Sequence, residues 1–155
     1  MILSCRVEAS EKTFSLKEKI SRSQVIALVT LTNEPTSKLE YYPQWDLNLP
    51  TAALSFSIDR FLKGTSEDKI IVKTVCSNAT AGFSLQGHEK GRKFIAYLKK
   101  ESTTEKGYIL AEYSNQFLEK IALDHTKVAD VGQGPNMVSL QEKLYKIRKI
   151  VAESR

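Results

Sequence analysis

Apolar and polar residues alternate over residues 54–59, which read LSFSID. A period of two residues is typical of a strand with one buried and one solvated face. We therefore predict a strand over residues 53–62. It is followed directly by Lys63 and Gly64, and the pattern alone does not say whether these two residues do more than end the strand.

Four further segments have the pattern of strands. Residues 24–32 are apolar and β-branched almost throughout, which indicates a strand buried on both faces. Residues 69–75, 92–100 and 106–113 are separated by polar or glycine-containing turns and predict three more strands. Residues 33–50 hold three of the 4 prolines and the 1 tryptophan, and form either a long connection or a hairpin with a decorated tip.

A helix is expected before the first strand and another after the last. Ser15 followed by Glu18 is a capping-box pattern, which predicts a short helix beginning near Leu16. Residues 114–123 predict a short helix capped by Ser114 or Asn115. Residues 124–136 read as a loop.

The last segment predicts an amphipathic helix. Ser139 and Glu142 form a second capping-box pattern. The residues that follow place four apolar side chains on one helical face, and these are Leu140, Leu144, Ile147 and Val151.

These elements fit one domain over residues 1–155. Five antiparallel strands of this length commonly close into a small barrel, because closure removes exposed edges. We expect the barrel core at about residues 5–121 and the C-terminal helix at about residues 139–153. The 41% hydrophobic content is ordinary for a globular chain and is enough to form a core.

The net charge of +5 fits two explanations, solubility or an anionic partner. Acidic residues are interleaved with the lysine clusters, which favours solubility. The chain has 2 cysteines, Cys5 and Cys76, and no CxxC pair, so we expect no thiolate zinc site. One long-range disulfide and two free thiols both remain possible.

The first residues read MILSCR, which is similar to the end of a bacterial lipoprotein signal, where a small residue precedes the acylated cysteine. The basic segment and the apolar core of a signal peptide are missing from this stretch. Either a trimmed signal precedes Cys5 or the match is due to chance.

We find no sequence signature of an enzyme. The 2 histidines, His88 and His125, lie in predicted loops beside Glu89 and Asp124, outside any HExxH arrangement. A nucleophile elbow, a Walker sequence and a glycine-rich phosphate loop are all missing from the sequence. We therefore expect a non-catalytic protein without a cofactor or a metal.

The order of these segments resembles the netrin-like family, which includes the inhibitory domain of the tissue inhibitors of metalloproteinases. The resemblance is carried by Cys5, the strand at residues 24–32, the Phe-Leu-Lys-Gly step at residues 61–64, the Gly82-Phe83 step and the GxxFIAY strand at residues 91–97. It implies an OB-fold-like five-stranded barrel and a secreted, periplasmic or lipid-anchored location. Ala81 stands where the family usually has a cysteine.

The resemblance also implies how the chain would act. A Cys5–Cys76 bridge would correspond to the bond that ties the amino terminus to the barrel in this family. In the animal inhibitors, the amine and carbonyl of a first cysteine bind the catalytic zinc of the protease, displacing its water. Met1 to Ser4 precede Cys5, so only a form that begins at Cys5 with a free amine could do this.

We expect a monomer that binds a protein partner, with a metalloproteinase as the family-level possibility. The predicted contact surface is Cys5, Tyr41, Tyr42, Trp45, Asn78, Ala79, Thr80, Ala81 and Gly82. The alternative is single-stranded nucleic-acid binding, because OB barrels stack bases on aromatic side chains in a basic groove. Its candidate residues are Tyr41, Tyr42, Trp45, Phe94 and Tyr97 with Lys73, Arg92 and Lys99, although packing is the simpler role for the aromatic residues.

Overall fold

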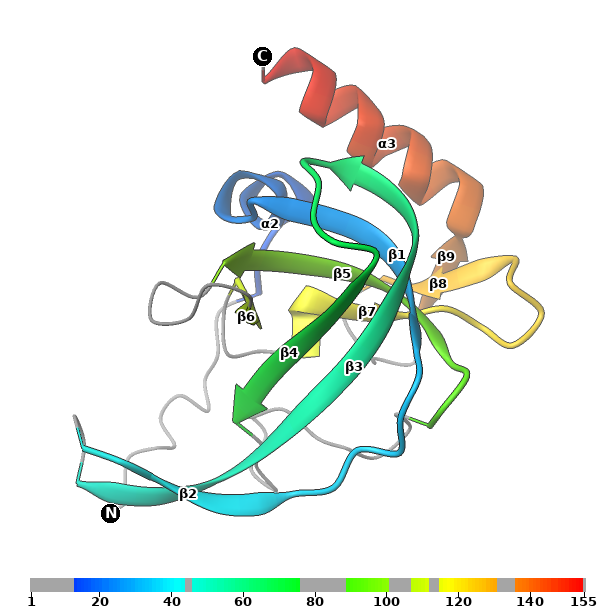
Figure 1. Cartoon of the computed structure of the whole chain (residues 1–155). Coiled ribbons are helices and arrows are strands. Elements are labelled where there is room, and N and C mark those ends of the chain that lie inside the picture. Colours follow the sequence, from blue (N-terminus) through cyan, green and yellow to red (C-terminus); the bar gives the residue numbers. More distant parts are fainter. Residues whose placement is uncertain are drawn as a thin grey trace.

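Figure 1 shows the computed structural model, in which a small barrel has helices at one end and a long hairpin at the other. The structure describes residues 13–43, 46–75, 89–100, 107–111, 115–130 and 136–154. The helices of this part are α2 (Leu16–Arg22) and α3 (Leu140–Glu153), with a 3-10 turn, η1 (Asn115–Phe117). The strands are β1 (Val25–Leu31), β2 (Lys38–Tyr42), β3 (Leu47–Lys63), β4 (Lys69–Val75), β5 (Lys93–Lys100), β6 (Gly107–Leu110), β7 (Leu118–Lys120), β8 (Lys127–Ala129) and β9 (Met137–Ser139).

The sheet closes into a barrel because β1 pairs on both of its edges. It is antiparallel to β3 along one edge and to β5 along the other. The other barrel neighbours are β3–β4, β4–β6 and β5–β6. In chain order, the barrel strands are therefore arranged as first, second, third, fifth, fourth and back to first. This confirms the predicted mainly β chain with a closed five-stranded barrel, and the order is that of an OB fold. The β4–β6 pair is parallel, whereas the sequence predicted antiparallel pairing throughout.

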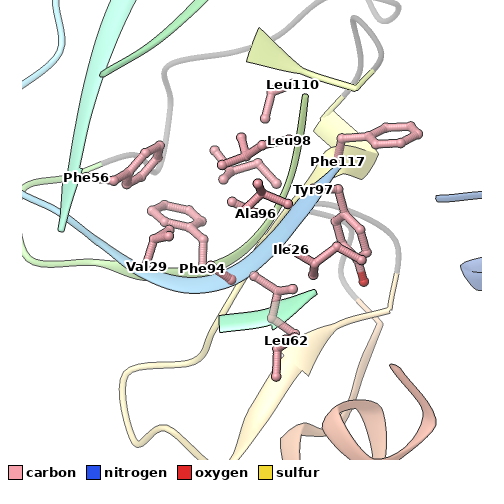
Figure 2. Packing of buried hydrophobic residues seen from close by; sticks show 14 of the residues in the cluster. Ile26, Val29, Phe56, Leu62, Phe94, Ala96, Tyr97, Leu98, Leu110 and Phe117 are labelled. Carbon is pink, nitrogen blue, oxygen red and sulfur yellow. The ribbon is translucent and has the colours of Figure 1, made fainter. Parts of the chain in front are cut away.

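Apolar side chains fill the barrel and cover part of its outside. Phe56 of β3 meets Phe94 of β5 edge-on inside the barrel, with ring centroids 6.1 Å apart (Figure 2). Residues 94–98 of β5 are all buried, so both faces of this strand are covered. On the outer face, Phe117 of η1 packs edge-on against Tyr97, with ring centroids 6.1 Å apart. The helices dock onto this outer layer.

The predicted helix at residues 114–123 is wrong. The chain makes the short turn η1 and then the strand β7, which pairs with Phe94–Ala96 of β5. The reason is that β6 covers the same edge of β5 only at Leu98–Lys100. The backbone groups of the rest of that edge need partners when they are buried, and β7 supplies them.

The expected loop at residues 124–136 is also partly a sheet. β8 and β9 form an antiparallel pair, and Ile121 makes an isolated bridge to Val128. Val128 and Ala129 are buried beneath α3. This small sheet leads directly into α3, whose N-cap is Ser139, as predicted. Leu144 and Ile147 of the predicted apolar face are buried, as is Val151.

Lys63, the last residue of β3, makes hydrogen bonds to helix α2. The predicted capping box of α2 is present, with Ser15 and Glu18 bonded to each other's backbone amides. At the other end of this helix, the ammonium group of Lys63 donates hydrogen bonds to the carbonyl oxygens of Ile20 (2.8 Å) and Ser23 (2.6 Å). The Ile20 carbonyl also accepts a hydrogen bond from the Ser23 amide at 3.2 Å, so Lys63 gives it a second donor, and a cation at this end complements the helix dipole.

Gly64 allows the chain to pass close to the start of β1. Its φ of 65° lies in the left-handed region, and a Cβ atom added there would lie 2.4 Å from the carbonyl oxygen of Gln24. Gly91 has a φ of 91° but open space around the same position. A comparison of the two glycines therefore distinguishes the cost of a left-handed backbone, which both share, from the cost of a steric clash, which only Gly64 has.

We expect Gly64→Ala to destabilise the protein more than Gly91→Ala. Both substitutions carry the cost of a left-handed conformation, about 1–2 kcal/mol, and only the first adds a clash with backbone. The free energy of unfolding, measured by denaturant titration, should fall by at least about 1 kcal/mol more for Gly64→Ala. Equal losses would mean that the close approach at Gln24 is relaxed without cost.

A buried ionic cluster, Lys19, Glu119 and Lys143, holds both helices to the barrel. Glu119 of β7 has 0% of its surface exposed, and its Oε2 accepts hydrogen bonds from Lys19 of α2 and from Lys143 of α3, the latter at 3.1 Å. Its other oxygen accepts a hydrogen bond from the hydroxyl of Tyr97 at 3.0 Å. Burial raises the pKa of Tyr97 well above its usual range and lowers the pKa of Lys19, against the attraction of Glu119.

We expect Glu119→Gln to be strongly destabilising because it removes the buried counter-charge of Lys19 and Lys143 and leaves only the exposed carboxylate of Asp130, 4.0 Å from Lys143. Breaking a buried pair in this way costs about 3–5 kcal/mol. The control is Asp59→Asn, which breaks a half-exposed pair with Lys93 (2.9 Å) and should cost less than about 1 kcal/mol. Denaturant unfolding of the two variants gives the comparison, and a small loss for Glu119→Gln would contradict the role given to the cluster.

Candidate protein interface on the β2–β3 arm

The hairpin interpretation of residues 33–50 is confirmed. β2 pairs with the first part of β3 in the register Lys38↔Thr51 to Tyr42↔Leu47. β4 pairs with β3 only from Thr51 onward, so the earlier residues of β3 extend past the barrel. We call residues 38–50 the arm. Figure 1 shows it projecting from the end of the barrel that lies away from the helices.

Three large apolar side chains of the arm are exposed to solvent. Leu39 is 70% exposed, Tyr41 56% and Leu47 51%. Leu39 and Tyr41 lie on one face of the ribbon because they alternate along β2, and Leu47 lies on the other face, opposite Tyr42. Grouped exposed apolar side chains are typical of an interaction surface, whereas isolated ones are ordinary.

Polar contacts hold the arm in shape. The hydroxyl of Tyr41 donates a hydrogen bond to Oδ1 of Asp46 at 2.6 Å, which raises the pKa of Tyr41. Asp46 has a φ of 50°, a left-handed conformation that Asp and Asn tolerate better than most residues. At the base of the arm, Lys73 of β4 donates to Glu40 at 2.8 Å, and this contact lowers the pKa of the Glu40 carboxyl. The arm is therefore tied at its tip and at its base.

We expect Asp46→Asn to lower the pKa of Tyr41 back toward its ordinary value of about 10. The substitution removes the negative charge that disfavours the ionised phenol, and it keeps a residue that accepts the positive φ. The measurement is an NMR titration of the Tyr41 ring with pH. An unchanged titration of the Tyr41 ring would contradict the role given to Asp46.

The structure describes only part of the predicted contact surface. Tyr41 and Tyr42 both lie in the arm. The other predicted residues lie outside the described part of the chain, and these are Cys5, Trp45, Cys76, Asn78, Ala79, Thr80, Ala81 and Gly82. The structure therefore tests neither the Cys5–Cys76 bridge nor the part of the surface at residues 78–82.

The residues proposed for nucleic-acid binding do not form one surface. Phe94 and Tyr97 are both fully buried and belong to the core, so they cannot stack bases. Lys73 is paired with Glu40. Arg92 donates to the carbonyl oxygen of Ile121 at 3.1 Å.

His125 has a local structural role. It has a φ of 62° in a tight turn, where its amide donates to the carbonyl of Ala122. The side chain of Asp124 accepts hydrogen bonds from Thr126, which lower the pKa of Asp124. His88 lies outside the described residues.

Sequence reasoning did not single out Leu39 and Leu47. The alternation of residues 38–42, KLEYY, is a usable signal for β2, since it places Leu39 and Tyr41 on one face. The exposure of that face follows only from the register with β3, which carries the arm beyond the barrel.

The chain matches no protein-family model, and a search of curated proteins found no match. Among residues 13–154, where the structure describes them, no group of three His, Cys, Asp or Glu side chains is placed to hold a metal ion. The helices of the described segments are too short or too polar to cross a membrane.

Proposed function

We propose that this chain is a non-catalytic, secreted or surface-anchored protein-binding domain that contacts its partner through the arm. The observation that carries the proposal is a two-stranded extension of a closed barrel with exposed apolar side chains on both faces, Leu39 and Tyr41 on one and Leu47 on the other. The extension is not needed to close the barrel, because β4 pairs with β3 only from Thr51.

The arm has properties that suit binding. Its conformation is fixed before contact by the Tyr41–Asp46 hydrogen bond at the tip and the Glu40–Lys73 pair at the base. Preorganisation lowers the entropy that is lost on binding. Tyrosine side chains that become desolvated at the centre of an interface commonly contribute a large share of the affinity, and leucine adds buried apolar area around them.

The resemblance to the tissue inhibitors of metalloproteinases makes a metalloproteinase the first partner to test. Two forms of the chain separate two modes of action. A form that begins at Cys5 with a free amine offers the zinc ligands of the animal inhibitors, whereas the chain that begins at Met1 offers the arm alone. Inhibition by the first form only would point to zinc binding, and equal binding by both would point to the arm.

We expect the triple variant Leu39→Ser/Tyr41→Ser/Leu47→Ser to raise the dissociation constant for the partner by about tenfold to a hundredfold, because three apolar contacts are lost together. Binding and inhibition are measured against a panel of purified secreted metalloproteinases at micromolar protein. The side chains are exposed, so the variant should remain folded. Leu123→Ser is the matched control, since Leu123 is 77% exposed outside the arm.

If neither form binds any protease of the panel at micromolar concentration, the metalloproteinase is rejected as the partner. If a protease binds but the triple variant and the Leu123→Ser control bind it equally well, the arm is not the contact surface.

A further inference from the structure

A cleft lies between the two helices, away from the arm. It has a volume of about 370 Å³ and is lined by residues of α2, α3 and β9 and by Asp130. Figure 1 places α2 and α3 at the end of the barrel that is opposite to the arm. The volume is within the range of small-molecule sites, about 300–1,000 Å³. We call it the helix cleft.

Three lysines converge on the helix cleft. Lys19 and Lys143 line it and are 2% and 6% exposed, and Lys146, one turn further along α3, lines it from an exposed position. Buried lysines are rare in proteins, and two in one place require a specific compensation.

The compensation inside the protein is incomplete. Both buried ammonium groups are bonded to the same carboxylate oxygen of Glu119. Each also donates to a backbone carbonyl, Lys19 to that of Gln116 (3.1 Å) and Lys143 to that of Asp130 (3.2 Å), but carbonyl groups add no negative charge. The next carboxylate is that of Asp130, whose Oδ1 is 4.0 Å from Nζ of Lys143 and whose side chain is 54% exposed. Glu142 also lines the cleft, but it is exposed, and water screens its charge. An anion in the cleft would balance the buried excess.

The remaining lining is apolar and suits the body of an organic molecule. Phe14, Leu16 and Val138 each line the cleft and are partly buried against the core. Ser15, at the N-cap of α2, adds a hydroxyl group at the edge. Apolar walls with a few convergent charged groups are the usual composition of a ligand site.

We propose that the helix cleft binds a small organic oxyanion, a carboxylate or a phosphate monoester on an apolar body, with its charged group beside Lys143 and Lys146. The apolar body lies against Phe14 and Val138. Glu119 accepts a hydrogen bond from Lys143 and so holds its ammonium group at the cleft. Carboxylates and phosphates share the negative oxygen atoms that lysine ammonium groups bind, and the probes below distinguish them.

The test uses benzoate, phenyl phosphate and the neutral analogue benzyl alcohol as probes of the full chain. Binding is followed by NMR signals of the lysine side chains and of Val138, with probe concentrations up to about 10 mM, which detects dissociation constants in the millimolar range. We expect one or both anions to shift the Lys143, Lys146 and Val138 signals, and benzyl alcohol to have no effect. The anion that binds more tightly identifies the class of ligand.

The key variant is Lys146→Met, with Lys149→Met as its matched control. Both lysines are exposed on α3 and both substitutions remove one positive charge, but only Lys146 lines the cleft. Lys146→Met should weaken anion binding about two- to fivefold, and Lys149→Met should leave it unchanged. Lys143→Met should weaken anion binding at least about tenfold. The substitution leaves Lys19 and Glu119 as an ion pair without net charge, so the chain should stay folded.

Three results would overturn the proposal. These are no shift with either anion at the highest concentration, equal binding of benzyl alcohol, and equal affinity in the Lys146→Met and Lys149→Met proteins. The triple arm variant should bind the anion as the unmodified chain does. The helix cleft and the arm can therefore be confirmed or rejected separately.

Discussion

Closure of the sheet is the constraint on which the rest of this structure depends. β1 pairs with β3 on one edge and with β5 on the other, which turns the alternate side chains of five strands inward. β4 pairs with β3 only from Thr51 onward, so the residues of β3 before Thr51 lie outside the barrel and form part of the arm. Closure also leaves part of one edge of β5 uncovered by β6, and β7 pairs there and brings Glu119 beneath the helices. Both candidate sites therefore arise from the way in which the barrel closes.

The helices are attached to this barrel by charge as well as by apolar contact. Two lysines from different helices meet one buried carboxylate, where each charge has lost most of its hydration. Well-packed apolar side chains of the same size commonly give equal or greater stability, so stability alone does not explain the charges. What the lysines add is a defined orientation of α2 against α3, since one oxygen of Glu119 accepts from both of them. They also place ammonium groups at a cleft that apolar side chains would leave neutral.

Local sequence patterns were enough to predict the barrel, but they could not predict what the closed barrel brings together. The five strands were found because alternation and β-branched runs are properties of single segments. β7 was missed because its segment forms a strand only where β5 offers an open edge, and tertiary pairing overrides local preference there. The Lys63–Gly64 step was noticed, but its role depends on carbonyl groups of α2 that are distant in sequence. Within the candidate sites, tyrosines drew attention to the arm, whereas the meeting of Lys19 with Lys143 has no sequence signal at all.

The length of β3 has a mechanical consequence. This one strand has 17 residues, about 55 Å at the usual rise, and it runs from the arm through the barrel wall to the lysine that caps α2. Its ladders to β2, β4 and β1 succeed one another along this length. A load applied to the arm along the strand axis would therefore strain many hydrogen bonds in parallel, in shear, and would not open them one at a time from an end. The register of β3 therefore couples the arm mechanically to the core of the barrel.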